Sequence, residues 1–317
     1  MEYSNKTSPV VFYLLGLSTD PQLQAVGFLI FLLMYLITLS GNLLLIIVVS
    51  INPKLKTPMY FFLANLSIID LCFSSTIVPI ILLNTLSKCR GISLQGCATQ
   101  MFFSLVLGVT ECLLLAMMAY DRYVAICKPL HYRSIMSKNI CISLALMAWA
   151  IGFVNASVHV VLTFQLPFCK SHHVNNFFCE VPPFLRMSCR DTRFNELGMF
   201  ISASIMVLCV FLLILVSYIN IIFTILKIQS SEGRHKAFST CASHLIVVSL
   251  FYGTLLFNYL QPRKDYSADT SKAVSILYTV VTPMLNPIIY SIRNKDVKNS
   301  IIKNATKKSH PTERALT

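Results

Sequence analysis

Residues 113–127, with the sequence LLLAMMAYDRYVAIC, carry two charged residues towards the end of a long apolar stretch. These are Asp121 and Arg122, and the apolar stretch around them covers residues 98–126. A charged side chain inside hydrocarbon costs about 3 kcal/mol or more, and such residues usually serve a function. The stretch therefore predicts a membrane helix with an acid–base pair close to one end.

The composition extends the membrane prediction to the whole chain. Of its 317 residues, 55% are hydrophobic and 12% are charged, whereas soluble domains usually contain about 25% charged residues. The formal net charge of +13 does not indicate nucleic-acid binding, because the basic residues lie in short segments between apolar runs rather than in a stripe interleaved with aromatics. With no internal repeat or linker, we expect a single membrane domain.

Seven apolar stretches reach the length of roughly 20 residues that a membrane-crossing helix needs. They cover residues 25–49, 58–83, 98–126, 140–162, 197–226, 237–260 and 271–292. In lipid, each segment must satisfy its own backbone polar groups, so we predict helices. Thr57-Pro58 is a typical start for the second one. The predicted fold is an all-α bundle of seven transmembrane helices over residues 25–292.

Two terminal segments flank the predicted bundle, residues 1–24 and residues 293–317. In the second, Val297, Ile301 and Ile302 share one helical face among lysines. This pattern predicts a short amphipathic helix along the membrane surface, and a solvated tail is the alternative.

The lysines and arginines predict the orientation in the membrane. They are enriched in the odd-numbered connections and in the last segment, with few acids beside them. Positively charged connections stay in the cytoplasm, so we expect a plasma-membrane protein with an extracellular N-terminus and a cytoplasmic C-terminus. Asp121 and Arg122 then lie at the cytoplasmic end of the third helix. Asn5, in Asn5-Lys6-Thr7, becomes an extracellular glycosylation acceptor.

The predicted topology divides the eleven cysteines into two groups. Cys97, Cys169, Cys179 and Cys189 fall in extracellular segments, where disulfides persist, and four cysteines allow three connectivities. Cys89 is also extracellular and is left over. The other six fall in or near the helices, where a cysteine is usually a small apolar residue. No Cys/His spacing predicts a metal site.

Four polar side chains fall near the middle of the predicted helices: Asn42, Asp70, Glu111 and Asn286. Unpaired buried carboxylates are costly, so these acids must be protonated, share a cation or accept hydrogen bonds. Two interpretations stay open. One is a structural polar network between helices, and the other is a switchable site for water or for a sodium ion. No other cofactor is expected.

The stretch TPMLNPIIY, residues 282–290, carries Pro287 inside the seventh helix. Proline removes a backbone donor and kinks a helix. Tyr290 falls one turn closer to the cytoplasm, near the depth of Arg122. A proline kink alone is common in membrane helices, but here it coincides with Asn286, Tyr290 and the acid–base pair.

Together these residues resemble the rhodopsin-like class of G-protein-coupled receptors. The matching positions are Gly41-Asn42, Asp70, Cys97, Asp121-Arg122-Tyr123, Trp149, Tyr218 and Asn286-Pro287-Ile288-Ile289-Tyr290. Within that class the chain is similar to olfactory receptors. The stretches that carry this similarity are KTPMYFFLANLSIIDLC (56–72), MAYDRYVAICKPLHY (118–132), KAFSTCASHL (236–245) and PMLNPIIYSIRNKDVK (283–298).

Two positions depart from the wider class in ways that are typical of olfactory receptors. The sixth helix has FYGT (251–254) in place of a Cys-Trp-x-Pro stretch, and the fifth has Val210 in place of a proline. These departures argue against an activation switch based on a tryptophan in the sixth helix, and Tyr252 would take that role instead.

The resemblance implies an odorant receptor that couples to a stimulatory heterotrimeric G protein and raises cyclic AMP. It implies the disulfides Cys97–Cys179 and Cys169–Cys189. It also implies roles in activation and G-protein coupling for Asp121, Arg122, Tyr123, Tyr218, Asn286, Pro287 and Tyr290. In the closed state Arg122 would contact either Asp121 or the sixth helix.

The predicted ligand site lies in the extracellular half of the bundle. Its walls would be Ser104, Leu105, Gly108, Val109, Met206, Tyr252, Leu255, Tyr259 and Thr279. Position 104 holds a serine rather than an acid, so a ligand with a charged amine is disfavoured. A mostly apolar cavity with a few hydroxyls suits a small volatile or lipophilic molecule. Packing within the core is the alternative role for each of these residues.

Other classes of protein share some of these features. Transporters and channels also keep acids in mid-membrane, but the helices show no inverted repeat or pair of broken helices. An enzyme is not expected, because His159 and His244 fall on different helices without a partner at catalytic spacing. Another alternative also remains: a receptor of this fold that senses a metabolite in another tissue.

Overall fold

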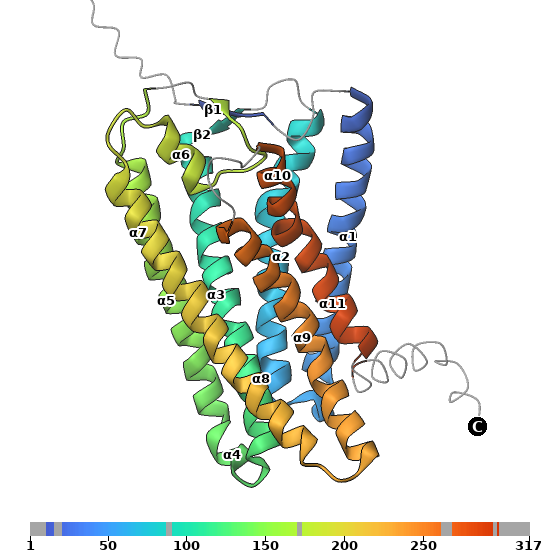
Figure 1. Cartoon of the computed structure of the whole chain (residues 1–317). Helices are drawn as coiled ribbons and strands as arrows, with labels where there is room; N and C mark the ends of the chain where they lie inside the picture. The colour runs from blue at the N-terminus through green and yellow to red at the C-terminus, as the bar shows by residue number, and fades with distance from the viewer. Residues whose placement is uncertain are drawn as a thin grey trace, which may run out of the picture.

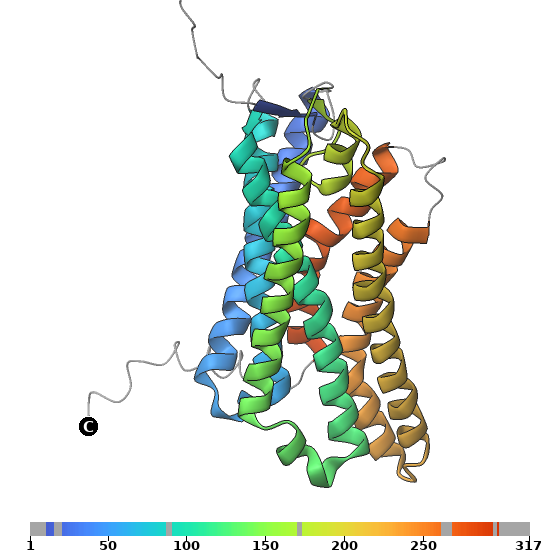
Figure 2. The same ribbon diagram turned by 90° about the vertical axis from the view of Figure 1, so that its left-hand side faces the viewer.

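The computed structural model describes residues 11–15, 21–86, 91–169, 173–260, 268–293 and 297. Within them, seven helical stretches are long and apolar enough to cross a membrane, and they stand side by side in an elongated bundle (Figures 1 and 2). Leu29 and Leu33 on the first helix, and Leu213 and Val216 on the fifth, are more than half exposed, as lipid-facing side chains are. The predicted fold class is confirmed.

The first four membrane helices are α1 (Pro21–Ile51), α2 (Pro58–Leu86), α3 (Leu94–Cys127) and α5 (Lys138–Phe164). The fifth consists of α7 (Arg193–Ser204), the π-helical turn η3 (Ile205–Cys209) and α8 (Val210–Leu226). The sixth is α9 (Ser231–Leu260), and the seventh consists of α10 (Ala268–Ile276), the π-helical turn η4 (Leu277–Val281) and α11 (Thr282–Arg293). Short helices connect them: η1 (Pro53–Leu55), η2 (Pro129–His131), α4 (Tyr132–Ile135) and α6 (Val181–Met187).

The helices extend beyond the apolar stretches by up to six residues, with the largest difference at the start of α9. Apolar length marks only the part of a helix that lies in hydrocarbon, whereas backbone hydrogen bonding continues into polar residues such as Glu232. The second helix begins at Pro58, as predicted. Most of the predicted amphipathic helix after the bundle, including Ile301 and Ile302, lies outside the described residues, and Val297 is buried.

A small three-stranded sheet, which the sequence did not predict, covers one end of the bundle. It consists of β1 (Val11–Leu14), β2 (Gly91–Ser93) and β3 (His173–Val174), in the order β2-β1-β3. β1 pairs antiparallel with β2 and parallel with β3. Phe12 and Leu14 are fully buried against the residues around Cys97 and Cys179. We call this end, which also carries both disulfides, the disulfide end, and we call the opposite end the Arg122 end.

Two glycines allow close contact between helices. A Cβ atom added at Gly41 would lie 3.0 Å from the Cγ of Pro287, and one added at Gly152 would lie 2.6 Å from Thr110 Oγ1 and 2.8 Å from the carbonyl oxygen of Val106. Small residues are common where membrane helices pack tightly. α1 therefore packs closely on α11, and α5 packs closely on α3.

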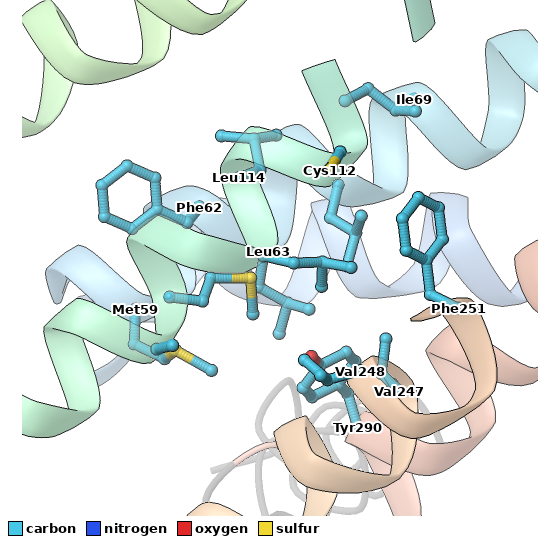
Figure 3. Close-up of a cluster of buried hydrophobic side chains, with 14 of the residues drawn as sticks. Met59, Phe62, Leu63, Ile69, Cys112, Leu114, Val247, Val248, Phe251 and Tyr290 are labelled. Carbon is cyan, nitrogen blue, oxygen red and sulfur yellow. The ribbon is translucent and has the colours of Figure 1, made fainter. Parts of the chain in front are cut away.

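The main hydrophobic core occupies the middle of the bundle. Figure 3 shows side chains from α2, α3, α9 and α11 that point toward one another. They include Met59, Phe62, Leu63, Ile69, Cys112, Leu114, Val247, Val248, Phe251 and Tyr290. This core holds in place the polar side chains that are embedded in it.

Candidate functional site

Asp121 and Arg122 form an ion pair at the Arg122 end. Arg122 Nη2 lies 2.8 Å from Asp121 Oδ2, and Arg122 Nε donates to the same oxygen at 3.2 Å. The side chain of Asp121 is fully buried and that of Arg122 is 14% exposed. Of the two contacts expected for Arg122, the structure contains the one to Asp121. The adjacent Tyr123 is half-buried, with the amine of Lys128 over its ring.

The second oxygen of Asp121 is held by Tyr132, which belongs to α4 in the connection after α3. Its hydroxyl donates to Asp121 Oδ1 at 2.7 Å. Burial, followed by the nearby Asp121 carboxylate, raises the pKa of Tyr132, so its hydroxyl stays protonated and can donate. The sequence did not single out this residue, because its role follows from the position of the connection beneath α3.

His244 joins three helices near the Arg122 end. Its Nδ1 lies 2.6 Å from the hydroxyl of Tyr218 on α8, and its Nε2 lies 3.0 Å from the carbonyl oxygen of Leu115 on α3. A carbonyl can only accept, so Nε2 carries hydrogen, and in the neutral ring Nδ1 accepts from Tyr218. Sequence reasoning found no partner at catalytic spacing for His244, and a lone histidine is more often a satisfied packing residue; here the fold satisfies both of its nitrogens.

Three of the four mid-membrane polar residues meet between α2, α3 and α11. Asn286 Nδ2 donates to Asp70 Oδ1 at 3.1 Å and to Oδ2 at 3.0 Å, and Glu111 lies close enough to Asp70 for their charges to interact. Asn42 takes a different place, where its Nδ2 donates to the carbonyl oxygens of Thr38 and Pro283 at 3.0 and 3.1 Å. It joins α1 to α11 beside Pro287.

Several oxygens of this region are buried and form no hydrogen bond to any described residue: Asn42 Oδ1, Glu111 Oε1, Asn286 Oδ1 and Tyr290 OH. Oxygen atoms are the ligands that hard cations prefer, so Asp70, Glu111 and Asn286 fit a monovalent cation such as sodium. Within the described part of the chain, no three His, Cys, Asp or Glu side chains come together to form a site for other metals.

Tyr252, on α9, contacts α3 in the middle of the bundle. Its hydroxyl lies 3.0 Å from Cys112 Sγ, and Cys112 Sγ lies 3.3 Å from the carbonyl oxygen of Met206 in η3. A continuous path of contacts therefore runs from the π-helical turn of the fifth helix, through α3, to α9. π-helical turns often occur at functional positions.

The four predicted ligand-site residues on α3 are partly buried. Ser104, Leu105, Gly108 and Val109 occupy the half of α3 that is nearer the disulfide end, and a Cβ added at Gly108 would meet nothing within 4 Å. The Ser104 hydroxyl donates to the carbonyl oxygen of Gln100 at 2.8 Å, so its oxygen lone pairs remain available. Open space and an acceptor therefore lie together on α3.

The other predicted walls come from three helices. Thr279 and Tyr252 are buried, and Met206 and Leu255 are partly buried. The Thr279 hydroxyl donates to the carbonyl oxygen of Ser275 at 2.6 Å. The side chain of Tyr259 lies outside the described residues.

The segment between α5 and α7, which we call the covering segment, is fixed over the disulfide end by two disulfides. Cys97 pairs with Cys179 and Cys169 with Cys189, with Cα–Cα distances of 5.5 and 5.7 Å. These are the pairs that the resemblance implies. Cys89 and Asn5 lie outside the described residues.

Gln100 adds hydrogen bonds next to the first disulfide. Its Oε1 accepts from the backbone N–H of Cys179 at 2.9 Å, and its Nε2 donates to the carbonyl oxygen of Thr76 at 3.0 Å. One buried amide on α3 therefore holds both the covering segment and α2.

Glu180 joins the covering segment to the seventh helix. Its Oε1 accepts from the hydroxyl of Tyr278 at 2.6 Å and from that of Ser275 at 3.1 Å. Burial raises the pKa of Glu180, and hydrogen bonds from Tyr278, Ser275 and Asn176 lower it by a smaller amount. Nothing in the local sequence marks this acid, because its position at the bundle depends on the fold, next to the Cys97–Cys179 disulfide.

A cleft of about 600 Å³ opens between α5 and α7, away from most of the predicted ligand site. Of the predicted ligand-site residues whose side chains the structure describes, only Met206 lines it. The lining residues are Ala150, Ile151, Val154, Asn155, Val158, His159, Leu162, Thr163, Val181, Phe194, Asn195, Gly198, Ser202 and Met206.

Comparison with known proteins shows which family the chain resembles. A family model described as olfactory receptor matches residues 31–308. Olfactory receptor 5AP2 of Mus musculus is 49% identical over 303 residues, which cover 96% of each chain. Olfactory receptor 5AU1 of Homo sapiens is 50% identical over 96% of this chain and 84% of its own length. Olfactory receptor 8U8 of Homo sapiens is 48% identical over 98% of this chain and 97% of its own length.

Proposed function

Because the chain belongs to the olfactory receptor family, we propose that it binds a small odorant within the helix bundle and activates a stimulatory heterotrimeric G protein, which raises cyclic AMP. The family consists of seven-helix G-protein-coupled receptors. The chain is accordingly a multi-pass plasma-membrane receptor and not an enzyme. The identity of its odorant, its coupling and the residues involved belong to the proposal.

The proposed orientation has the disulfide end outside the cell and the Arg122 end in the cytoplasm. Two disulfides at one end support it, because disulfides persist in extracellular conditions. Lys54, Lys56, Lys128 and Lys138, which belong to or flank the connections at the other end, support it through the positive-inside rule. The N-terminus is then extracellular, with Asn5 available for glycosylation.

The observation that carries the proposal is the closed arrangement at the Arg122 end. Arg122 is bound to Asp121, which also accepts from Tyr132, while Tyr218 and His244 tie α8 and α9 to α3. In the proposed active state these contacts open, Arg122 faces the G protein, and Tyr218 and Tyr290 support it from α8 and α11. Tyr123 and Pro287 shape the same surface and the kink above it.

The proposed odorant site has Ser104, Leu105, Gly108 and Val109 on one side. The other walls are Met206, Tyr252, Leu255, Tyr259 and Thr279. The contact of Tyr252 with Cys112 supports a route for the signal, because a ligand that displaces this tyrosine moves α9 relative to α3. The ligand needs only to favour the open state, and couplings of about 1–3 kcal/mol are usual.

A sodium ion, as proposed, would be held in the closed state by Asp70, Glu111 and Asn286. When bound, it would supply positive charge to two buried acids. Asp70 already accepts two hydrogen bonds from Asn286, and the free oxygens of Glu111 and Asn286 face no described donor.

A cyclic-AMP assay with an odorant panel, in cells that express the chain, tests the proposed function. Gly108→Leu should abolish the response to any odorant found, because leucine fills open space in the proposed site without a backbone clash. Gly253→Leu is the matched control. Gly253 also has open space around it, but it is exposed on α9, so this variant should respond normally.

Surface expression of both variants must equal that of the natural chain. An unchanged response of Gly108→Leu would rule out the proposed ligand site. A chain that is present at the cell surface and that raises cyclic AMP with no odorant of a broad panel would count against the proposed function itself.

A further inference from the structure

The cleft between α5 and α7 faces the membrane rather than the inside of the bundle. The two helices lie side by side along one flank (Figure 1), and three of the lining residues are about half exposed or more: Val154 at 65%, Val158 at 49% and Phe194 at 75%. Its lining belongs to two membrane-spanning stretches, apart from Val181. A molecule dissolved in the bilayer can therefore reach the cleft directly.

Two hydrogen bonds fix how the walls of the cleft face each other. Asn155 Nδ2 donates to Ser202 Oγ at 2.6 Å, and Asn195 Nδ2 donates to the carbonyl oxygen of Leu162 at 3.1 Å. In this antiparallel register His159 stands opposite Gly198. A Cβ added at Gly198 would meet nothing within 4 Å, so open space lies across from the imidazole.

Among the polar side chains that line the cleft, His159 is the one whose polar atoms have no hydrogen-bond partner in the described part of the chain. Asn155 and Asn195 are engaged as described, and Thr163 Oγ1 donates to the backbone carbonyl of His159 at 2.7 Å. The ring of His159, by contrast, forms no hydrogen bond to any residue in the described part of the chain, and it is partly exposed toward the cleft. A polar group in hydrocarbon without a partner is costly.

The polarity of the cleft changes along its length. His159, Thr163 and Asn195 lie toward the disulfide end, and Ile151, Val154 and Met206 lie deeper in the membrane. From residue 150 to residue 163 the wall on α5 is about 20 Å long, and His159 lies about 8 Å from the end of that helix, at 1.5 Å per residue. A bilayer amphiphile has the same layout, with its polar group near the surface and its hydrocarbon inside.

We propose that this cleft binds a sterol of the surrounding bilayer, with the sterol hydroxyl hydrogen-bonded to His159 and its ring system along Ile151, Val154 and Met206. The described lining includes no Lys, Arg, Asp or Glu, so it does not favour a phosphate head group. The volume is in the range of about 300–1,000 Å³ that small-molecule sites occupy. A rigid ring system also loses less conformational freedom on binding than a flexible acyl chain.

The proposal is separate from odorant recognition, although Met206 connects the two regions. Met206 lines the cleft, and its carbonyl oxygen accepts from Cys112, which contacts Tyr252. A bound sterol therefore lies next to the path of contacts between η3 and α9. The experiment below measures binding alone and uses no odorant.

The test is photolabelling of the purified full chain in phosphatidylcholine nanodiscs that contain a diazirine-bearing sterol, with the modified peptides mapped by mass spectrometry. The label is expected on residues 150–163 and 194–206, and excess unlabelled sterol should remove it. Label spread evenly over the lipid-facing helices, without competition, would overturn the proposal.

Two substitutions test the position of the sterol and its hydrogen bond to His159, and a third is the control. Gly198→Leu fills the space opposite His159 and should abolish labelling of the cleft. Gly27→Leu, at another glycine of a membrane helix with open space around it, should leave the labelling unchanged. His159→Phe keeps a ring but removes its nitrogens, and labelling should fall about five-fold, as expected for the loss of one hydrogen bond.

Thermal unfolding midpoints in the same nanodiscs show whether each variant is folded. If a folded Gly198→Leu variant were labelled as strongly as the natural chain, the cleft would be excluded as the sterol site. If Gly198→Leu lost the label and a folded His159→Phe variant kept it fully, the assignment of the hydroxyl to His159 would be wrong.

Discussion

The hydroxyl of Tyr218 lies 2.6 Å from Nδ1 of His244, and the other ring nitrogen of this histidine lies 3.0 Å from the carbonyl oxygen of Leu115. One side chain of α9 therefore holds α8 and α3 together. His244 is fully buried, so no water replaces these bonds in the closed state. The arrangement favours a receptor that is silent until α9 moves.

Replacing His244 by Phe should raise signalling in the absence of odorant. The change removes two hydrogen bonds of about 1 kcal/mol each, so the closed state loses stability relative to the open one. Basal cyclic AMP, normalised to surface expression, is expected to rise several-fold. Tyr218→Phe is the comparison, since it keeps the bond to Leu115 and should have a smaller effect. A basal level equal to that of the natural chain would contradict the role of His244.

Tyr132→Phe should also increase basal signalling, because it removes one of the three hydrogen bonds that Asp121 accepts. The hydroxyl donates to a carboxylate, and such a bond contributes about 1.5–3 kcal/mol. The ring itself is retained, so packing should change little. The measurement is again basal cyclic AMP at equal surface expression, and a decrease would show that Tyr132 supports the open state instead.

Arg122→Ala should abolish odorant-driven cyclic AMP while most of the protein still reaches the cell surface. In the proposed mechanism the guanidinium contacts the G protein, and no other cation of α3 can replace it. Surface staining and cyclic AMP are measured on the same cells. Full signalling by this variant would exclude the proposed coupling mechanism.

Glu180 should make the stability of the receptor depend on pH. Its pKa is raised above its ordinary value of 4.5 by burial, so the folded chain binds this proton more tightly than the unfolded chain does. The contribution of Glu180 to stability therefore falls as the pH rises from below 4.5 through the raised pKa. Glu180→Gln carries no such proton and lacks this dependence.

The measurement is the thermal unfolding midpoint in nanodiscs between about pH 4 and pH 7.5, a range that brackets the ordinary pKa of a carboxyl group. On going to the higher pH, the natural chain should lose stability relative to Glu180→Gln. Parallel curves for the two proteins would mean that the hydrogen bonds from Tyr278 and Ser275 offset the burial completely.

Features that depend on local sequence were predicted well. The seven helices follow from apolar length alone, and α2 begins at Pro58 because a proline after a capping residue is a local signal. The sheet was missed, since β1, β2 and β3 have between two and four residues each and exist through pairing with distant segments. Their short patterns cannot be distinguished from those of a loop.

The candidate site shows the same division. Asp121, Arg122, Asp70 and Asn286 stand out in the sequence because charge and amide groups are rare in membrane helices. Tyr132, Gln100 and Glu180 do not, because tyrosine, glutamine and loop acids are common. The roles of these three residues, and the partners of His244, come from the atoms that folding brings within reach. The disulfide pairs came from the family resemblance, since the spacing of four cysteines allows three pairings.

The absence of a side chain at Gly152 limits which parts of the receptor can move. The backbone of α5 lies so close to Thr110 and to the carbonyl oxygen of Val106 that a side chain at residue 152 would collide with them, so the two helices pack here in direct contact over the glycine. α3 and α5 should therefore travel as one rigid body. Spin labels placed on this pair would keep a constant separation during activation, while the separation between α3 and α9 increases.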